Sequence, residues 1–125
     1  MSEQSIEQLI QEKGLTAPRV TMELIQSKIK QEYFFTAQEG YWGQQSNTKY
    51  PDEITNGDNS LNLLTFCVLV LDNGFTVTGE SACASPENFD PEIGKKIAKD
   101  NAINKIWLLE GYLLKEQLKN SRIFR

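Results

Sequence analysis

The sequence predicts a small α+β domain, in which a small antiparallel sheet built on a β-hairpin packs against two or three helices. A long apolar run over residues 61–71 is followed by Asp72-Asn73-Gly74, which is typical of a hairpin turn, and by a second strand over residues 75–83. Asp90-Pro91-Glu92 then provides a capping side chain, a proline at the first helical position and an acidic first turn. The longest helix is therefore predicted over residues 91–118.

Composition limits the classes of function. The chain has 125 residues, of which 39% are hydrophobic and 24% charged, as expected for one folded domain over residues 1–125. Its formal net charge of -4 has the wrong sign for a protein that binds the phosphates of duplex nucleic acid. There is no basic and apolar leader after Met1, and the longest apolar run, Phe66 to Leu71, is too short to cross a membrane. We therefore expect a cytoplasmic protein that binds neither duplex nucleic acid nor membrane.

The residue types available also limit the chemistry. The sequence contains no histidine, which excludes Ser-His, Cys-His and His-metal sites. Cys67 and Cys83 lie in the two predicted strands without the spacing of a zinc or redox motif, so we expect reduced thiols. The glycines form no phosphate-binding loop, and no nucleophile stands beside a base. These observations predict no metal, no cofactor and no enzymatic activity.

The remaining elements follow from local patterns. Residues 1–14 carry apolar residues at helical spacing and end at Gly14, which predicts an N-terminal helix. Thr21 can cap a second helix that ends near Gln31 or Glu32. The aromatic passage that follows, from Tyr33 to Gly43, is expected to pack under a loop because its glycines disfavour a helix. Residues 44–60 are predicted to form an exposed loop, and residues 121–125 a basic tail.

The hairpin turn predicts which face of the sheet is buried. If Asn73 and Gly74 are the centre of the turn, Asp72 pairs with Phe75. The predicted core face then holds Leu64, Phe66, Val68 and Val70 together with Phe75 and Val77. The opposite face is mixed, with residues 65, 67, 69 and 71 beside Thr76, Thr78 and Glu80.

A polar line on the long helix is the most specific functional signal in the pattern. Asn101, Lys105 and Tyr112 lie between two apolar sectors of a helix that reads as sandwiched between neighbours. In the structural alternative, Asn101 caps a neighbouring backbone while Lys105 keeps its ammonium in water. In the functional alternative, these groups and the strand end at Thr78, Glu80 and Ser81 line a pocket for a polar phosphorylated ligand. Both alternatives remain open.

Much of the chain resembles a family of phage proteins. The sequence resembles the gp-forty-nine-like family of small tailed-phage and prophage proteins. The resemblance lies in the segments Leu63–Leu71, Asn73–Ser81 and Pro86–Asp90, and it continues through Ile97-Ala98, Asn101-Ala102, Lys105-Ile106-Trp107 and the stretch from Leu109 to Leu114. Pro18-Arg19-Val20-Thr21 and Tyr33-Phe34-Phe35-Thr36-Ala37 extend the resemblance, which covers Pro18 to about Leu118. The domain is also similar to phage anti-Thoeris proteins, small oligomeric sponges for cyclic ADP-ribose-type immune signals. The resemblance implies a phage accessory protein inside a bacterial host cell.

Three hypotheses of function follow. The first is a host-defence antagonist that sequesters a nucleotide immune signal, of the cyclic ADP-ribose type or a cyclic oligonucleotide, without cleaving it. Its candidate ligand-binding residues are Arg19, Thr21, Phe75, Thr78, Glu80, Ser81, Asn88, Phe89, Asn101 and Lys105. The second is a protein-binding accessory factor that inhibits or partners a host or phage protein. The third, an enzyme using Glu80 or Lys105, lacks a supporting motif. A homo-oligomer is expected under all three.

Overall fold

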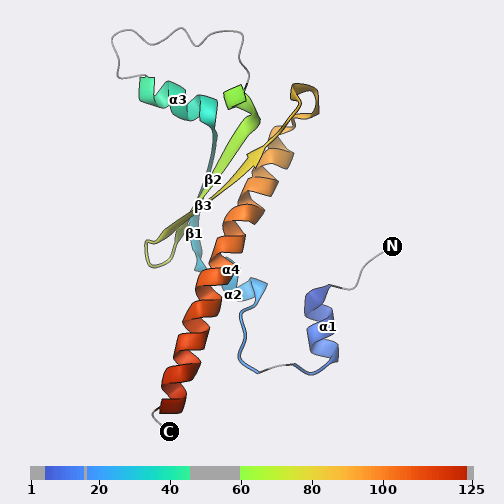
Figure 1. Ribbon diagram of the computed structural model, residues 1–125, viewed down its shortest axis with the longest axis vertical. Helices are drawn as coiled ribbons and strands as arrows, with labels where there is room; N and C mark the ends of the chain where they lie inside the picture. Colours follow the sequence, from blue (N-terminus) through green and yellow to red (C-terminus); the bar gives the residue numbers. More distant parts are fainter. Residues whose placement is uncertain (1–4, 16, 46–59, 124–125) are drawn as a thin grey trace.

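The computed structural model describes residues 5–15, 17–45 and 60–123 and confirms the α+β class (Figure 1). Three strands form one antiparallel sheet in the order β1-β2-β3, so that β2 is central. In chain order the elements are α1 (Ile6–Glu12), α2 (Met22–Lys28), β1 (Ile29–Thr36), α3 (Ala37–Gln45), the 3-10 turn η1 (Ser60–Leu63), β2 (Leu64–Leu71), β3 (Thr76–Ala82), the 3-10 turn η2 (Pro86–Asn88) and α4 (Pro91–Ile123).

The strand β1 was not predicted, and the predicted extension of the second helix to Gln31 or Glu32 is wrong. The helix α2 ends at Lys28, and the chain continues directly as β1. Ile29, Tyr33 and Phe34 are β-branched or aromatic residues that favour a strand. Their backbone pairs with β2 over the whole length of that strand, and this ladder outweighs the helical spacing of Leu24, Ile25 and Ile29.

The hairpin is confirmed, but its turn has three residues instead of two. The Leu71 backbone nitrogen donates to the Phe75 carbonyl oxygen at 2.8 Å, so Leu71 and not Asp72 faces Phe75. Gly74 has φ +90°, the left-handed conformation that such a three-residue turn requires. Because side chains alternate along a strand, this difference of one residue exchanges the two faces of β2 relative to Phe75 and Val77.

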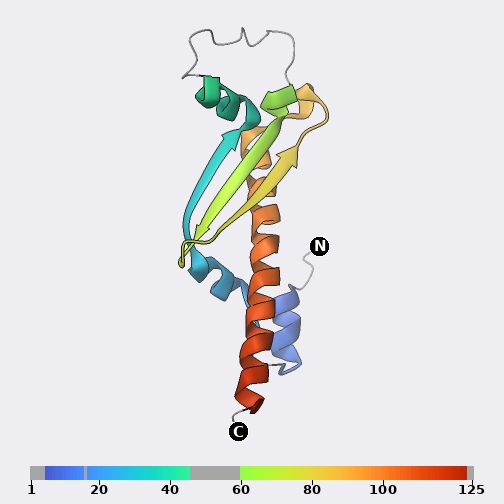
Figure 2. The ribbon, with the colours of Figure 1, turned by 60° about the vertical axis from the view of Figure 1, so that its left-hand side comes forward.

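The predicted core face is therefore right for Val77, which is buried, and wrong for Phe75 and for the residues of β2. The buried face of β2 holds Thr65, Cys67, Leu69 and Leu71, and Leu69 pairs with Val77 of β3. The helix α4 covers this face, as both ribbon views show (Figures 1 and 2). The residues that complete the core are mostly on α4, together with one residue of α2: Ile25, Ala98, Ala102, Ile103 and Ile106.

The helix α4 begins where the sequence predicts and ends later. The Asp90 carboxylate accepts from the backbone nitrogens of Glu92 at 2.8 Å and Ile93 at 3.2 Å, which caps the first turn. The helix has 33 residues and is therefore about 50 Å long, whereas the eight residues of β2 span only about 26 Å. Residues 121–123 of the predicted basic tail continue the helix, and residues 124–125 lie outside the described residues.

Two short helices, α1 and α3, lie beside the unit formed by the sheet and α4. The helix α1 is confirmed over Ile6–Glu12 with a capping box at Ser5, and none of its residues is buried. The helix α3 was not predicted, because Gly40 and Gly43 are poor helix formers. It includes the first two residues of the predicted loop 44–60, and residues 46–59 of that loop lie outside the described residues. Gly40 lies against the Phe35 ring, so α3 sits at one end of the sheet.

Candidate functional site

Two residues of the polar line on α4, Asn101 and Lys105, contact strand β3 at the edge of the sheet. The Asn101 side-chain nitrogen donates to the Glu80 carbonyl oxygen of β3 at 2.7 Å, and the Lys105 ammonium lies 3.4 Å from the Thr78 hydroxyl. Strand β3 is an edge strand, whose outward carbonyl groups need partners. This geometry corresponds to the structural alternative for Asn101. Tyr112 is 72% exposed and lies farther along α4.

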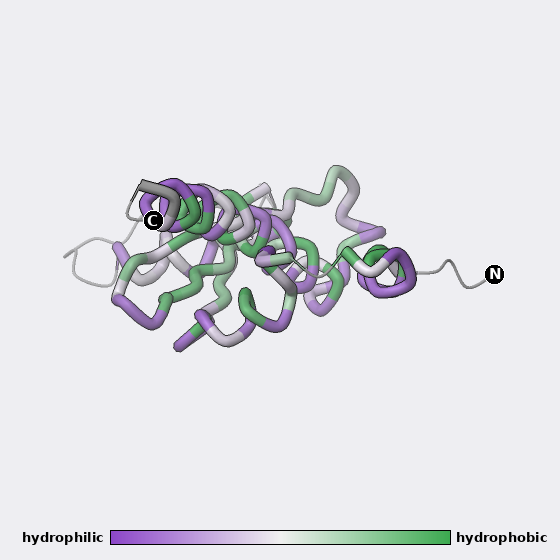
Figure 3. The backbone as a smooth tube through the Cα atoms, turned by 90° about the horizontal axis from the view of Figure 1, so that it is seen from below, coloured by the Kyte–Doolittle hydropathy of each residue, from purple (hydrophilic) through white to green (hydrophobic). Residues whose placement is uncertain are grey.

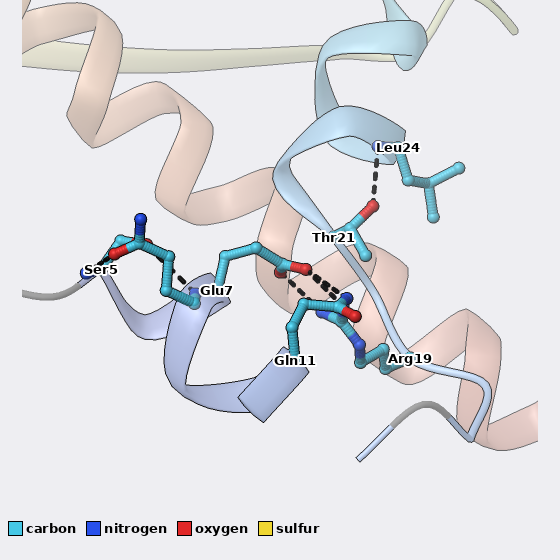
Figure 4. A network of polar contacts seen from close by, with 7 residues as sticks. Ser5, Glu7, Gln11, Arg19, Thr21 and Leu24 are labelled. Atoms are coloured by element: carbon cyan, nitrogen blue, oxygen red, sulfur yellow. Dashed lines mark hydrogen bonds and ion pairs between the residues drawn. The ribbon is translucent and has the colours of Figure 1, made fainter. Parts of the chain in front are cut away.

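Arg19 and Thr21 both make hydrogen bonds within the segment that contains α1 and α2 (Figure 4). The Arg19 guanidinium donates to both carboxylate oxygens of Glu7, at 2.9 and 2.6 Å. These hydrogen bonds lower the pKa of Glu7 from 4.5 to about 2, and Glu7 raises the pKa of Arg19. The Thr21 hydroxyl accepts from the Leu24 backbone nitrogen at 3.1 Å and caps α2.

Two adjoining hollows share the Phe89 ring near the beginning of α4. The smaller, of about 190 Å³, is lined by three predicted residues, Ser81, Asn88 and Phe89. The larger, of about 300 Å³, extends from Phe89 to Phe35 and carries the charged side chains Glu39 and Lys95, which were not predicted. Sequence spacing gives no signal for Glu39 and Lys95, because only the fold brings residues of α3 and α4 to the same hollow.

Charge around these hollows does not favour an anion. The carboxylate of Asp90 already occupies the free backbone nitrogens at the start of α4. The Lys95 ammonium lies 3.8 Å from the Glu92 carboxylate, and Glu39 accepts from the Thr36 backbone nitrogen at 2.9 Å. A phosphate would therefore meet the Asp90 carboxylate in the smaller hollow, and the Glu39 carboxylate beside the Lys95 ammonium in the larger one.

The predicted ligand-binding residues do not converge on one site. Arg19 and Thr21 lie in the N-terminal segment, and Phe75 is exposed in the hairpin turn. Thr78, Glu80, Asn101 and Lys105 lie along the β3 edge, where two of their contacts join α4 to β3. Only Ser81, Asn88 and Phe89 share a hollow.

The remaining chemistry-bearing groups give no cluster. Cys67 is buried and Cys83 half-buried, and both are free thiols. Burial raises the pKa of Cys67 to about 11, which disfavours the reactive thiolate. Within residues 5–15, 17–45 and 60–123, no three Cys, Asp or Glu side chains gather as metal ligands would. Over the same residues, no helix is long and apolar enough to span a membrane.

The largest unexplained feature is the face of the sheet opposite α4, which we call the open sheet face. Its centre is the row Tyr33, Val68 and Thr78, and on either side lie the remaining members of the three strands. These are Gln31, Phe35, Leu64, Phe66, Val70, Thr76, Glu80 and Ala82. Of the described helices, α3 contacts this face at its Phe35 end, and none lies across its centre in either ribbon view (Figures 1 and 2), where Tyr33 is 50% exposed.

One sequence signal could have identified this face. Strands buried on both faces are continuously apolar, whereas strands with one wet face alternate. Strand β2 reads as a nearly continuous apolar run, and the structure covers only its Cys67 and Leu69 side with α4. The other apolar side of β2, which carries Phe66, Val68 and Val70, therefore indicates a surface that binds a further element or partner.

Comparison with known proteins gives one relationship. The family described as Phage protein (N4 Gp49/phage Sf6 gene 66) matches residues 20–118, which include every strand and most of α4 and exclude α1. No curated protein and no solved structure gives a significant match.

Proposed function

The chain belongs to this phage protein family, and from that premise we propose that it is an accessory protein that acts by binding another protein rather than by catalysis. The open sheet face is the proposed binding surface. The proposed occupant is an amphipathic helix of a host or phage protein. The observation that carries the proposal is the apolar side of β2 that no described element covers.

The dimensions of the open sheet face suit a helix. Three strands of seven or eight residues give a surface of about 26 by 14 Å, or roughly 350 Å². The apolar part of this area lies on β1 and β2, beside the polar Thr76, Thr78 and Glu80 of β3, and apolar patches of a few hundred Å² on a monomer are often functional. On the other face the sheet already binds a helix, α4, and a sheet between two helical layers is a stable arrangement.

The chemistry of the surface defines the partner further. Phe35, Phe66 and Val68 are apolar, and the Phe35 and Phe66 rings lie 5.6 Å apart between centroids. Glu80 carries the carboxylate on the β3 side of this face. We therefore expect a partner helix with an apolar stripe and a basic residue at its border.

Site-specific photo-crosslinking tests the proposal. A photoreactive phenylalanine analogue replaces Tyr33, at the centre of the open sheet face, and the full chain is expressed in infected host cells. The matched control carries the same analogue at Phe75, which is exposed in the hairpin turn and outside the face. The expected result is a discrete crosslinked protein from position 33, absent from position 75, whose purified form binds the wild-type chain.

The variant Val68→Lys places a charge at the centre of the face and should abolish this binding while the thermal unfolding midpoint remains well above the assay temperature. Equal crosslinking from positions 33 and 75, or binding that survives Val68→Lys, would contradict the proposal.

A second candidate function is sequestration of a nucleotide immune signal. The observation that favours it is the smaller hollow at Phe89, which three predicted ligand-binding residues line, and the phosphates of a bound nucleotide would have to point away from Asp90 and Glu39. A nucleobase could stack on Phe89 while Ser81 and Asn88 contact polar groups. Thermal unfolding against cyclic dinucleotides, cyclic trinucleotides and cyclic ADP-ribose isomers tests it, since a ligand that binds only the folded state raises the midpoint. A selective rise that Phe89→Ala removes and Phe75→Ala retains, with the ligand recovered intact, supports sequestration; a flat response rejects it.

A further inference from the structure

Strand β1 leaves one edge of the sheet without a pairing strand. It pairs with β2 on one side, and no described element lies along its other side in Figure 2. The opposite edge differs, because the Asn101 side chain of α4 donates to the Glu80 carbonyl oxygen of β3. Edge strands are commonly protected by lysine, by a bulge or by a covering element. On β1 such protection lies at the beginning, where Lys30 interrupts the register, and at the end, where Glu39 accepts from Thr36.

The middle of this edge presents backbone groups at a regular spacing. The Thr36 backbone nitrogen donates to the Glu39 carboxylate at 2.9 Å, so this N–H group points away from β2. In an antiparallel strand the backbone groups point outward at every second residue. Phe34 and Glu32 therefore each direct an N–H and a C=O group away from the sheet, while the residues between them bond to β2. Two residues thus offer four hydrogen bonds to an added strand.

The larger hollow, of about 300 Å³, lies where this edge approaches the beginning of α4. Phe34 and Thr36 line it from the strand, and Phe89 and Lys95 line it from the beginning of α4. Both strand residues lie on the α4 side of the sheet, because they pair with buried residues of β2. An added strand would direct every second side chain to this side of the sheet and thus toward the hollow.

Two lysines of α4 reach the β1 side of the sheet. Seen from below, α4 carries hydrophilic as well as hydrophobic positions around its circumference (Figure 3). The Lys99 ammonium lies 2.7 Å from the Glu32 carboxylate and is thereby neutralised. The Lys95 ammonium lines the hollow, and its contact with Glu92 on the same helix is longer, at 3.8 Å. Lys95 can therefore still bind a polar group of a partner.

The side chain that suits this hollow is tyrosine. Phe35, Phe89 and Pro91 form apolar walls against which an aromatic ring can pack. The Glu39 carboxylate lines the same hollow as the Lys95 ammonium. A phenol hydroxyl can donate to a carboxylate and accept from an ammonium, whereas a charged side chain would meet one like charge.

We propose that the β1 edge and the larger hollow bind an extended segment of a host or phage protein, which adds a fourth strand to the sheet and places a tyrosine side chain in the hollow. In this mode of recognition, main-chain hydrogen bonds to Glu32 and Phe34 give affinity, and the hollow gives specificity. The ladder is short, so an isolated peptide should bind with a dissociation constant on the order of 100 µM.

This inference does not rest on the proposed function. The β1 edge binds through backbone groups directed away from the sheet, whereas the open sheet face binds through the side chains at its centre. Val68→Lys, which should abolish helix binding, should therefore leave peptide binding within about threefold of wild type. Lys95→Met, which changes the hollow, should leave the crosslink from position 33 unchanged.

Fluorescence anisotropy with synthetic peptides and the full chain tests the proposal. The probe is a fluorescein-labelled heptapeptide of alternating threonine and valine with tyrosine as its central residue, and matched peptides carry phenylalanine, alanine or aspartate there. The tyrosine peptide should bind about threefold tighter than the phenylalanine peptide and at least about tenfold tighter than the other two. Lys95→Met should remove the preference for tyrosine over phenylalanine, whereas Lys96→Met, at an exposed position outside the hollow, should retain it.

Glu32→Pro tests the backbone contact separately. It removes an outward N–H group, and proline is tolerated on an edge strand where the missing N–H faces solvent. Glu32→Ala is the matched control, because it also removes the ion pair with Lys99 but keeps the N–H group. Glu32→Pro should weaken binding of the tyrosine peptide at least about tenfold, and Glu32→Ala by less than about threefold. Circular dichroism checks that both variants fold, and the peptide series on the wild-type chain does not depend on them.

Three results would overturn the proposal: no saturable binding of the tyrosine peptide up to about 1 mM, no preference for tyrosine over alanine, or equal affinity of the Glu32→Pro and Glu32→Ala variants. Sedimentation equilibrium without peptide gives a fourth. If the wild-type chain associates and Glu32→Pro alone dissociates it, the β1 edge pairs with a second copy, and an extended segment of another protein is the wrong occupant.

Discussion

Replacing Gly79 with alanine should separate α4 from the sheet. Gly79 lies on β3 directly beneath the helix, and a Cβ added there would lie 2.2 Å from the Ala98 carbonyl oxygen and 2.3 Å from the Ala102 nitrogen. Carbon and oxygen atoms normally approach no closer than about 3.3 Å. Both opposing atoms belong to the helix backbone, so no side-chain rotation can relieve the clash, and α4 must shift by about 1 Å.

The cost follows from what this shift disturbs. Overpacking a core typically destabilises by about 1–3 kcal/mol, and displacement of a whole helix also loosens the contacts of Ala98, Ala102 and Ile106 with β2 and β3. We expect a loss of about 3–5 kcal/mol, a large part of the stability of a domain of this size. The sign is itself diagnostic, since alanine in a strand interior is ordinarily better than glycine by roughly 0.5–1 kcal/mol.

Urea unfolding followed by far-UV circular dichroism measures the effect. The matched control is Gly111→Ala on α4, where an added Cβ meets nothing within 4 Å. That control should gain about 0.5–1 kcal/mol through helix propensity. If Gly79→Ala is as stable as wild type, the close approach of α4 to β3 is not what requires glycine, and the packing argument fails.

Further predictions address single groups. Gln38 is 2% exposed and its side-chain nitrogen has no hydrogen-bond partner among the described residues, so Gln38→Met should stabilise the fold by about 1 kcal/mol and raise the unfolding midpoint by a few degrees in calorimetry. Asp90→Ala should lose about 1 kcal/mol in urea unfolding, because two backbone nitrogens of α4 lose their acceptor, and an unchanged midpoint would argue against the cap. The pKa of Glu7 is lowered from 4.5 to about 2, so its contact with Arg19 is fully present above pH 4.5 and is lost as pH falls toward 2. Hydrogen exchange of α1 at fixed temperature should therefore show less protection at pH 2.5 than at pH 5 after correction for intrinsic rates, and Arg19→Ala should remove the difference.

The fold class was predictable because its strongest signals are local. The Asp72-Asn73-Gly74 turn and the Asp90-Pro91 helix start depend on a few adjacent residues, and both are confirmed. The choice of buried face was not predictable to the same degree. A turn of two residues and a turn of three residues both suit this sequence, and only the Leu71 to Phe75 pairing distinguishes them.

Strand β1 could not be predicted because its stability is non-local. Its residues pair with a strand about 35 positions later in the chain, and Lys30, Gln31 and Glu32 interrupt the alternation expected of a half-buried strand. Glu32 is explained only by the fold, since its carboxylate lies 2.7 Å from the Lys99 ammonium of α4. Tertiary contacts of this kind override the local preference for helix.

The candidate site was predicted least well for a related reason. Asn101 and Lys105 both contact β3, and sequence spacing cannot distinguish a ligand from an edge strand as the partner of such polar groups. Arg19 was proposed as an anion ligand, yet Glu7 lies twelve residues earlier and supplies the carboxylate. The polar residues were found, but their partners depend on the fold.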